Sequence, residues 1–289
     1  MTFYIGAHMP VANIIKSFQT IQDLGGNFMQ IFINNPRGTA NPRLIEKYTL
    51  LAPSIVKHMT DNNLKLVIHA PYVINFAAPF DKESAKFKTI FDELIVADML
   101  GAIGCVIHVG KNLIGNKMVA TGNMLKSLKY IAKFIKNNNL RSKLILETAA
   151  GQGKEMFTTE NNSMNGYASF YHMLTEDEKN YVKICIDTCH IFAAGMDIRT
   201  RPNVKELFKQ LKYMDLLQHI VVIHFNDSKK DYNTHVDRHE AIGQGKIGFS
   251  GLSEVLKFAH KYSIPCTLET PGTSYVEEIP WIIKLIEKY

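Results

Sequence analysis

Leu144-Ile145-Leu146-Glu147 is a short run of apolar residues that ends in a side chain able to bind a metal ion. The same pattern occurs at Leu66-Val67-Ile68-His69, Val106-Ile107-His108, Ile184-Cys185-Ile186-Asp187, Val221-Val222-Ile223-His224 and Cys266-Thr267-Leu268-Glu269. The ends of these runs recur roughly every 40 residues, about the length of one strand plus one crossover helix. A single polar residue after a buried strand is usually structural. Six in register predict parallel strands that carry ligands to one common face.

Two more apolar runs, together with the segments between the runs, indicate the fold class. Phe3-Tyr4-Ile5-Gly6-Ala7-His8 and Phe28-Met29-Gln30-Ile31-Phe32-Ile33 complete a set of eight. Segments between the runs have helical periodicity, most clearly over 86–100 and 124–135. This alternation predicts an α/β fold, a single (β/α)8 TIM barrel over residues 1–289 with its active site at the C-terminal ends of the strands. An open doubly wound sheet is the alternative, but it would recruit fewer strands to its site.

The composition fits one barrel domain and disfavours several other classes. With 289 residues, 46% of them hydrophobic, the chain can bury a large core. The start at 1–6 lacks a secretory pattern and the apolar stretch 94–109 contains Asp98, so we expect an intracellular, cytoplasmic monomer without a membrane span. The four cysteines lack zinc-knuckle spacing and are expected to be buried thiols in a reducing compartment. The net charge of +6 fits a polyanionic partner, although Lys-rich helices give the same value.

Nine side chains at or just beyond the strand ends have the chemistry of metal ligands. The strand ends supply His69, His108, Glu147, Asp187, His224 and Glu269, and the loops beyond them supply His190, Asp237 and His239. Imidazoles mixed with carboxylates suit zinc, with Mn2+ as the alternative at one site. One metal takes about three or four protein ligands. The set therefore predicts about three metals per chain, with one carboxylate bridging two of them.

A cluster of this kind favours one type of reaction. The charge of three divalent ions exceeds that of four carboxylates, so an oxyanion is the expected substrate group. Closely spaced metals generate hydroxide at neutral pH and stabilise both the attacking and the leaving oxygens of a phosphoryl displacement. We therefore expect phosphodiester hydrolysis. The long polar segment 226–249, which follows the strand ending at His224, is also expected to be functional.

Several local motifs surround these ligands. They are His69-Ala70-Pro71-Tyr72, Glu147 with Ala150-Gly151-Gln152-Gly153, Asp187-Thr188-Cys189-His190, His224-Phe225-Asn226-Asp227-Ser228, 235–239 followed by Gly243-Gln244-Gly245-Lys246-Ile247-Gly248, and Glu269-Thr270-Pro271. Through nearly its whole length the chain thereby resembles the endonuclease IV family, the metal-dependent apurinic/apyrimidinic-site endonucleases of base-excision repair. The motifs are highly specific in combination, whereas a solitary His-Ala-Pro would not be.

The resemblance implies a trinuclear zinc site and a reaction. One zinc would be held by His69, His108 and Glu147, a second by Glu147, Asp187, His224 and Glu269, and a third by His190, Asp237 and His239. A hydroxide between the first two zincs would attack the phosphorus 5′ to a baseless sugar. The third zinc would stabilise the departing 3′ oxygen, leaving a 3′-hydroxyl and a 5′-deoxyribose phosphate. Glu147 as the bridge and Glu269 as the group that orients the hydroxide are the candidate catalytic residues.

The implied partner is double-stranded DNA that contains abasic sites or blocked 3′ ends. The duplex must be opened, because a baseless sugar inside it cannot reach recessed metals. Arg37 and Tyr72 match the insertion residues of the family. Val73 stands where a Leu is expected, and Gly38 stands where a longer polar side chain is common. These two departures concern how completely the gap left by the flipped sugar is filled, and not whether the site is catalytic.

Further DNA contacts are expected from the long polar segment. Asn226, Ser228 and Lys229 are candidates for contacts with the phosphate backbone. The glycines Gly243 and Gly245 leave two interpretations open. Their backbone N–H groups can approach a phosphate, or the pair can form a tight turn.

Two other functions remain as alternatives. The first is a metal-dependent sugar isomerase or epimerase of the same barrel superfamily, with Glu147 and Glu269 as an acid–base pair. It gives no role to His190, Asp237 and His239. The second is a non-catalytic lesion-binding protein, against which the complete ligand set argues.

Overall fold

Eight parallel strands close into a barrel in the computed structural model, which describes residues 2–38 and 41–289. Hydrogen bonds join neighbours in the order β1-β10-β7-β6-β5-β4-β3-β2. The strands are β1 (Ile5–His8), β2 (Phe28–Ile31), β3 (Lys65–His69), β4 (Gly104–His108), β5 (Lys143–Glu147), β6 (Val182–Asp187), β7 (Ile220–His224) and β10 (Cys266–Leu268). The predicted (β/α)8 fold is confirmed, and the open doubly wound sheet is wrong because β1 pairs with both β2 and β10.

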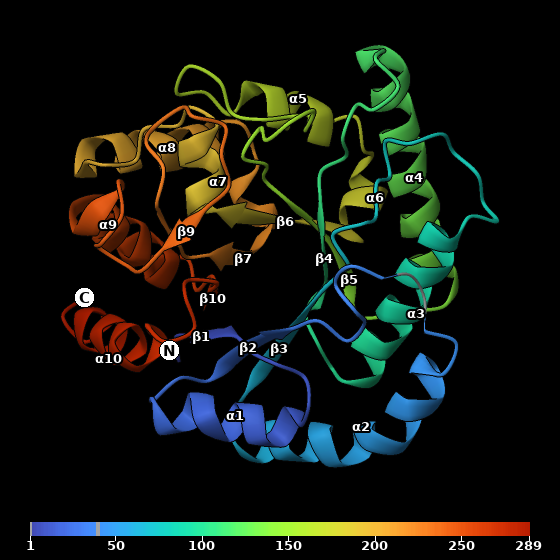
Figure 1. The fold of residues 1–289 in the computed structure, drawn as a ribbon, viewed down its shortest axis with the longest axis horizontal. Helices are drawn as coiled ribbons and strands as arrows, with labels where there is room; N and C mark the ends of the chain where they lie inside the picture. The colour runs from blue at the N-terminus through green and yellow to red at the C-terminus, as the bar shows by residue number, and fades with distance from the viewer. Residues whose placement is uncertain (1, 39–40) are drawn as a thin grey trace.

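Helices surround the barrel (Figure 1) and cover the outer faces of the strands. They are α1 (Ile14–Asp23), α2 (Leu44–Asp61), α3 (Ala85–Met99), α4 (Lys117–Asn137), α5 (Asn165–Tyr171), α6 (Glu176–Lys179), α7 (Thr188–Ala193), α8 (Arg201–Tyr213), α9 (Gly248–Lys261) and α10 (Tyr275–Ile286), with a 3-10 turn η1 (Leu217–His219). The helix expected at 86–100 is α3, and the one expected at 124–135 is the central part of the longer α4. No helix among the described residues is long and apolar enough to cross a membrane.

Local sequence explains where several of these helices begin. Asn13, Asn116 and Thr200 each precede a helix, and their side chains accept hydrogen bonds from backbone N–H groups of the first turn. Such caps satisfy donors that have no partner within the helix. In α1 the buried residues Ile14, Phe18 and Ile21 recur at helical spacing and lie in the core. The helices are therefore oriented by an apolar stripe and delimited by polar caps.

Inside the barrel, side chains are arranged in layers. One layer consists of buried residues contributed by six strands: Phe28, Val67, Val106, Ile145, Cys185 and Val222. Two residues further along the same strands come Gln30, His69, His108, Glu147, Asp187 and His224. Alternate residues of a strand face the same side, so this second set lies above the first within the barrel. The apolar layer thus forms the floor on which the candidate ligands stand.

The long polar segment contains structure that the sequence analysis did not predict. Two short strands, β8 (Asp227–Ser228) and β9 (His239–Glu240), pair antiparallel within it. Asp227 pairs with Glu240, and Ser228 pairs with His239. β8 starts just after β7, and its partner β9 contains the candidate ligand His239. The pairing therefore folds the segment back over the barrel and brings His239 to the strand ends.

Candidate metal centre

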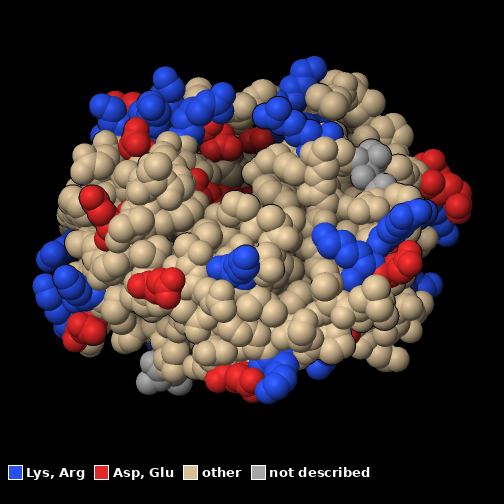
Figure 2. Space-filling view, turned by 60° about the horizontal axis from the view of Figure 1, so that its bottom comes forward, with Lys and Arg blue, Asp and Glu red and all other residues tan. Residues whose placement is uncertain are grey.

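The nine predicted ligands converge at the C-terminal end of the barrel. Seven of them line one cavity of about 360 Å³: His69, His108, Glu147, His190, Asp237, His239 and Glu269. The other two, Asp187 and His224, are fully buried beside it. One face of the molecule is correspondingly hollowed, with acidic side chains in the depth of the hollow and Lys and Arg side chains near its edge (Figure 2). The strand ends therefore form one site, as the register of the apolar runs predicts.

Glu147 lies between two groups of potential ligands. Its Oε2 atom is 3.4 Å from His69 Nε2 and 3.4 Å from His108 Nε2. Its Oε1 atom is 2.8 Å from His224 Nδ1. The two carboxylate oxygens thus face different groups, which is the arrangement required of a carboxylate that bridges two metals. The strand register places it there, because Glu147 ends β5 opposite His108 of β4.

His224 is the centre of the second group. Its Nδ1 atom lies 3.2 Å from Glu269 Oε2 and 3.8 Å from Asp187 Oδ2, in addition to its contact with Glu147. The potential ligand atoms of these four residues all lie within 4.8 Å of one another. The same holds for His69, His108 and Glu147. Two of the three ligand sets implied by the family resemblance are therefore already assembled, with Glu147 common to both.

A third group lies on the side of α7 and β9. Asp237 approaches both imidazoles, with Oδ2 3.2 Å from His190 Nε2 and Oδ1 3.3 Å from His239 Nε2. Asp187 Oδ2 is also near, 3.9 Å and 3.5 Å from the same two nitrogen atoms. Asp187 therefore borders both the second and the third group. This shared position is a detail that spacing along the sequence does not give.

The imidazoles of the third group test whether the residues fit a metal. Among the described residues, His190 Nε2 and His239 Nε2 are buried without any hydrogen-bond partner, although carboxylate oxygens lie close to them. Buried polar atoms are rarely left unsatisfied. Two nitrogen atoms and nearby carboxylate oxygens, gathered without hydrogen bonds from those nitrogen atoms, are what a shared cation would satisfy. The donor set fits zinc.

Hydrogen bonds outside the ligand groups fix which nitrogen atom each imidazole presents. The Nδ1 atoms of three histidines lie near backbone carbonyl oxygens: His69 with Ala70 at 2.7 Å, His190 with Thr148 at 2.8 Å and His239 with Glu269 at 3.1 Å. Their Nε2 atoms consequently face the cluster. Such outer partners orient metal-binding histidines and set their tautomer. His224 is reversed, because its Nε2 lies 2.8 Å from Gln30 Oε1 and its Nδ1 faces the carboxylates.

Two residues that organise the site lie outside the predicted site residues. Gln30 contacts His224, donates to Glu269 Oε1 and lies 3.0 Å from His8 Nδ1. Gln152 accepts a hydrogen bond from the backbone of Asp237. Gln30 could have been found, since it is a polar residue inside an otherwise apolar strand at an inward-facing position. Gln152 lies in the loop after β5, and its place in the motif Ala150-Gly151-Gln152-Gly153 was the signal that could have found it.

The electrostatics of the site favour a bound cation. Burial lowers the pKa of His190, but Asp187 and Asp237 raise it well above the ordinary value overall. Burial would raise the pKa of Asp237, but the neighbouring His190 and His239 hold it at about 2. His108 differs, because burial lowers its pKa to about 4 and leaves a neutral imidazole. Asp237 thus stays ionised, whereas burial raises the pKa of Asp187. The ionised carboxylates require positive charge, which either protons or metal ions supply.

The loops after β2 and β3 lie at the mouth of the cavity. Tyr72 and Val73 line it and are about half exposed, at 54% and 51%. The Tyr72 ring packs against the imidazoles of His69 and His108, with centroid distances of 5.4 Å and 5.5 Å. Tyr72 is therefore less separate from the ligands than its loop position suggests. Arg37 is exposed on the neighbouring loop and does not line the cavity.

Asn226 and Ser228, which were expected to contact DNA, have other partners in the structure. Asn226 is fully buried, where its amide donates to Asp187 Oδ2 and its Oδ1 accepts from the Glu269 backbone. Ser228 is fully buried and donates to the Lys230 carbonyl. These two expectations are corrected, because neither side chain reaches the surface. Asn226 instead positions two ligands.

Of the two interpretations of Gly243 and Gly245, the structure favours the tight turn over the phosphate contact. The N–H groups of Gly243 and Gly245 donate to Asp227 Oδ2, at 2.9 Å and 3.1 Å. Ile247 donates to Asp227 Oδ1 at 2.9 Å. The loop is therefore a turn wrapped around a buried carboxylate, and its N–H groups are not free for a phosphate. Lys229 remains exposed, 3.7 Å from Glu240.

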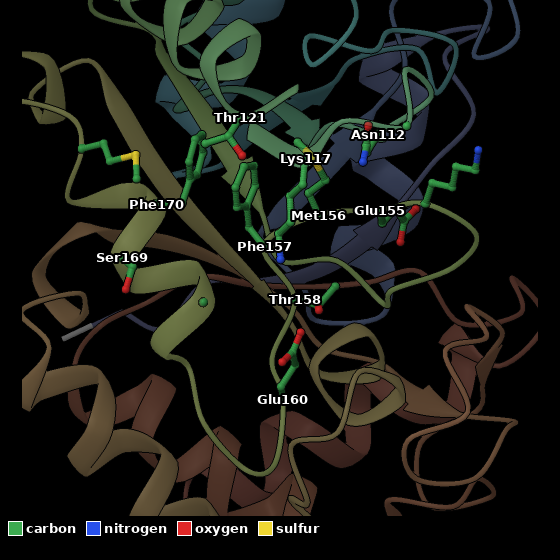
Figure 3. A pocket seen from close by; sticks show the side chains of 14 residues that line it. Asn112, Lys117, Thr121, Glu155, Met156, Phe157, Thr158, Glu160, Ser169 and Phe170 are labelled. Carbon is green, nitrogen blue, oxygen red and sulfur yellow. The ribbon is translucent and has the colours of Figure 1, made fainter. Parts of the chain in front are cut away.

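A second cavity lies beside the metal centre. It has a volume of about 560 Å³ and is bounded by α4, α5 and the loop after β5 (Figure 3). Phe157 and Phe170 stack within it at a centroid distance of 3.6 Å. Glu155 lines both cavities, but no predicted metal ligand lines this one. The ligand cluster therefore belongs to the smaller cavity alone.

Comparison with known proteins identifies the family. A family model described as "Xylose isomerase-like TIM barrel" matches residues 18–285. The "Putative endonuclease 4" of Acanthamoeba polyphaga mimivirus is 32% identical over 301 residues, covering 100% of this chain and 92% of that protein. The chain belongs to the endonuclease IV family. The "Probable endonuclease 4" of Nitrosopumilus maritimus is 31% identical, covering 92% of this chain and 93% of that protein.

Solved structures show that the same barrel also serves other proteins. Endonuclease IV from Thermus thermophilus superimposes with a TM-score of 0.74 at 24% identity, covering 99% of this chain and 100% of that one. A D-tagatose 3-epimerase-like protein has a TM-score of 0.68 at 16% identity, covering 99% of this chain and 96% of that one. At these identities the likeness concerns the fold alone. Membership of the endonuclease IV family therefore rests on the sequence relatives.

Proposed function

We propose that this member of the endonuclease IV family hydrolyses the phosphodiester bond 5′ to an abasic site in double-stranded DNA, leaving a 3′-hydroxyl and a 5′-deoxyribose phosphate. The observation that carries the proposal is the position of Glu147. One of its oxygens faces His69 and His108, and the other faces His224. A single carboxylate between two ligand groups is suited to hold two metals closely enough to act on one phosphate.

The residues divide into three ligand sets for about three zinc ions. His69, His108 and Glu147 form the first, Glu147, Asp187, His224 and Glu269 the second, and His190, Asp237 and His239 the third. When bound, zinc supplies an activated water at neutral pH and stabilises negative charge on phosphate oxygens. The protein's own contribution is to hold the ligands in fixed directions before substrate arrives. The backbone carbonyls bonded to His69, His190 and His239 serve this purpose.

Glu269 is the proposed orienting carboxylate. It is held from two sides, because Gln30 donates to its Oε1 and its backbone N–H donates to Asn226. His224 and His8 hold the pKa of Glu269 well below its ordinary value although burial opposes this. A permanently ionised carboxylate can accept a hydrogen bond from the attacking water and fix its direction toward phosphorus. Its Oε2 atom is 3.2 Å from His224, so it lies at the second ligand group.

The proposed substrate matches the shape and charge of the site. The cavity of about 360 Å³ is lined mainly by polar and charged side chains, with Tyr72 and Val73 at its mouth. A sugar without a base can enter such a space once it leaves the duplex, and the unstacking cost is lowest where the base is already missing. Basic residues near the hollow are suited to the phosphate backbone on either side. Blocked 3′ ends carry a phosphate ester on the 3′ oxygen and are a second proposed substrate.

The test uses purified protein, its metal content and a short duplex with one stable abasic analogue. We expect about three zinc atoms per chain. We also expect one cut 5′ to the lesion, a product end that a DNA polymerase extends, and no cut in the undamaged duplex. Loss of cutting after chelation and its recovery with zinc would tie the reaction to the metals. A protein that binds the duplex without cutting it, or contains one metal or fewer, would refute the proposal.

A sugar isomerase or epimerase is the second candidate function. The observation that favours it is the family model described as "Xylose isomerase-like TIM barrel", which matches residues 18–285. That reaction would leave the assembled set of His190, Asp237 and His239 without a task. Free ketosugars incubated with the same zinc-loaded protein should therefore remain unchanged. Turnover of a sugar together with an intact abasic duplex would favour the second candidate.

A further inference from the structure

A buried carboxylate lies outside the metal centre, and no described residue of opposite charge is in contact with it. Glu93 of α3 is 0% exposed. Its Oε1 accepts a hydrogen bond of 2.8 Å from Asn34 Nδ2, and its Oε2 accepts a 3.3 Å contact from Cys105 Sγ. Burying a carboxylate costs several kcal/mol unless it is well paired. A position on the inner face of a helix would normally be filled by an apolar side chain.

Asn34 connects this carboxylate to the loop after β2. It is 8% exposed, and Glu93 is its side chain's sole hydrogen-bond partner among the described residues. The loop continues through Asn35 and Pro36 to Arg37. Asn35 Oδ1 accepts from the Arg37 backbone at 3.0 Å and so tightens the turn. The direction in which Arg37 leaves the barrel thus depends on where Asn34 is held.

The same loop is bonded to the loop after β3. The backbone N–H of Tyr72 donates to the carbonyl of Pro36 at 2.9 Å. Glu93, Asn34 and Pro36 therefore form a continuous path from α3 to the backbone of Tyr72. The rings of Phe32 and Tyr72 add a contact between the two loops, with centroids 5.1 Å apart. The loops of both proposed insertion residues are consequently linked to the buried hydrogen bond between Asn34 and Glu93.

We propose that Glu93 is a positioning residue, which through Asn34 holds the loops of Arg37 and Tyr72 in the conformation that opens the DNA. The proposal rests on the proposed function, since it concerns the step before hydrolysis. It assigns no contact with substrate to Glu93, which is enclosed by Asn34, Cys105 and the core. Burial raises the pKa of Glu93 to about 7, in keeping with a carboxyl group whose main partners are neutral.

Glu93→Met and Asn34→Ala each remove the bond from one side. Met has a similar length, so it avoids a large cavity, and Asn34→Ala keeps the proposal testable if Glu93→Met folds poorly. Glu93→Gln retains an acceptor for Asn34 and serves as the conservative rescue. Glu254→Gln, at a buried glutamate of α9, is the matched control. All variants are measured as full-length, zinc-loaded protein.

The first readout is cleavage of two substrates, a fully paired abasic duplex and one whose lesion lies at a frayed 3′ end. Losing a bond to a charged group is expected to cost about tenfold in kcat/KM on the paired duplex. The frayed substrate needs less opening, so its loss should stay within about threefold. The double variant should be no worse than either single variant, because one bond is removed in each. Glu93→Gln and Glu254→Gln should stay within about twofold of the original rate.

The second readout does not depend on catalysis. Amide hydrogen exchange at Tyr72 should accelerate about tenfold in Glu93→Met and Asn34→Ala, because its acceptor Pro36 is no longer held. Unchanged exchange at Tyr72, equal losses on both substrates, or loss of zinc would overturn the proposal. If the original protein cuts no abasic duplex at all, the proposed function fails, and the exchange data alone still decide whether Glu93 anchors the loops.

Discussion

The metal centre and the two loops at its mouth are built in opposite ways. In the metal centre, Asp187 and His224 are fully buried, and most imidazoles have one nitrogen atom fixed by a backbone carbonyl or by Gln30. At the mouth, Tyr72 is 54% exposed and Arg37 lies on an exposed turn. The ligands are braced from several strands, whereas the loops depend on a few local hydrogen bonds.

This difference separates two physical tasks. Chemistry at a phosphate requires ligand positions held to a fraction of an ångström, which packed strand ends and outer hydrogen bonds supply. Opening a duplex requires side chains that enter DNA and leave it again, which exposed loops allow. Changes in the first region should therefore abolish the reaction, and changes in the second should alter its dependence on the substrate.

The largest effect is expected from Glu147→Ala. Glu147 touches two ligand groups, so its removal should release up to two metals. It removes the carboxylate that faces His69, whereas His224 keeps Glu269 and Asp187 nearby. We expect a loss of about 10³-fold or more in cleavage, because metals supply several kcal/mol of transition-state stabilisation. Elemental analysis and single-turnover cleavage measure this. A variant that keeps three metals would show that Glu147 is no bridge.

His190→Ala should have a smaller effect on metal content. The first two ligand groups do not include His190, so we expect loss of one metal with the other two retained. Cleavage should fall by about 10²-fold, as for removal of one group that stabilises developing charge. His260→Ala on α9 is the matched control and should change neither quantity. Loss of all metals from His190→Ala would mean that the three groups are not separable.

Much of the fold was predictable because strand ends and apolar periodicity carry the same information. The eight strands start and end within a few residues of the predicted runs, and β5 ends at Glu147 as its run does. The ribbon β8–β9 was not predicted. Each of its strands has two residues, too short for a period-two pattern, and its pairing depends on contacts across the loop.

In the candidate site, the residues at strand ends were predictable from the sequence, and those placed by contacts across the fold were not. Residues such as His69 and Glu147 lie where strand register places them, and register can be read from the sequence. Asn226 was misassigned, since its motif neighbours suggested a surface loop while the fold buries it between Asp187 and Glu269. Glu93 gave no signal, because a lone glutamate in a helix is usually exposed and its partner Asn34 lies 59 residues away.

The free energy of unfolding should also depend on pH through the buried side chain of Glu93. The pKa of Glu93 is about 7, above the ordinary value of 4.5. The stability that the protonated carboxyl group contributes is therefore present below about pH 4.5 and is lost as the pH rises through 7. Between pH 4.5 and 8 the free energy of unfolding should therefore fall by roughly 2–3 kcal/mol more than in Glu93→Gln. Denaturant titrations of both proteins at a series of pH values measure how the free energy of unfolding changes with pH. Saturating zinc is present throughout, so any effect of metal release is common to both proteins. Parallel curves would contradict the raised pKa.

Arg37→Ala tests the exposed side of the comparison. The side chain does not line the cavity, so zinc content should be unchanged. Cleavage of a paired abasic duplex should fall by about tenfold, because less of the unstacking cost is offset, and cleavage at a frayed 3′ end should fall less. Tyr72→Ala is a weaker probe, since the ring also packs on His69 and His108. Equal losses on both substrates would place Arg37 in general DNA binding.

The smallest effect is expected from Lys229→Ala, which probes the phosphate backbone rather than the lesion. Lys229 is exposed next to Glu240 of β9, so its removal leaves the ligands of the metal centre in place. If it neutralises one phosphate, affinity for any duplex should fall only a few-fold, and the slope of log affinity against log salt should decrease by about one. Lys209→Ala, at an exposed lysine of α8 paired with Glu206, is the control and should leave the slope unchanged. An unchanged slope in Lys229→Ala would remove this residue from the DNA-binding surface, and a loss confined to abasic duplex would place it at the lesion.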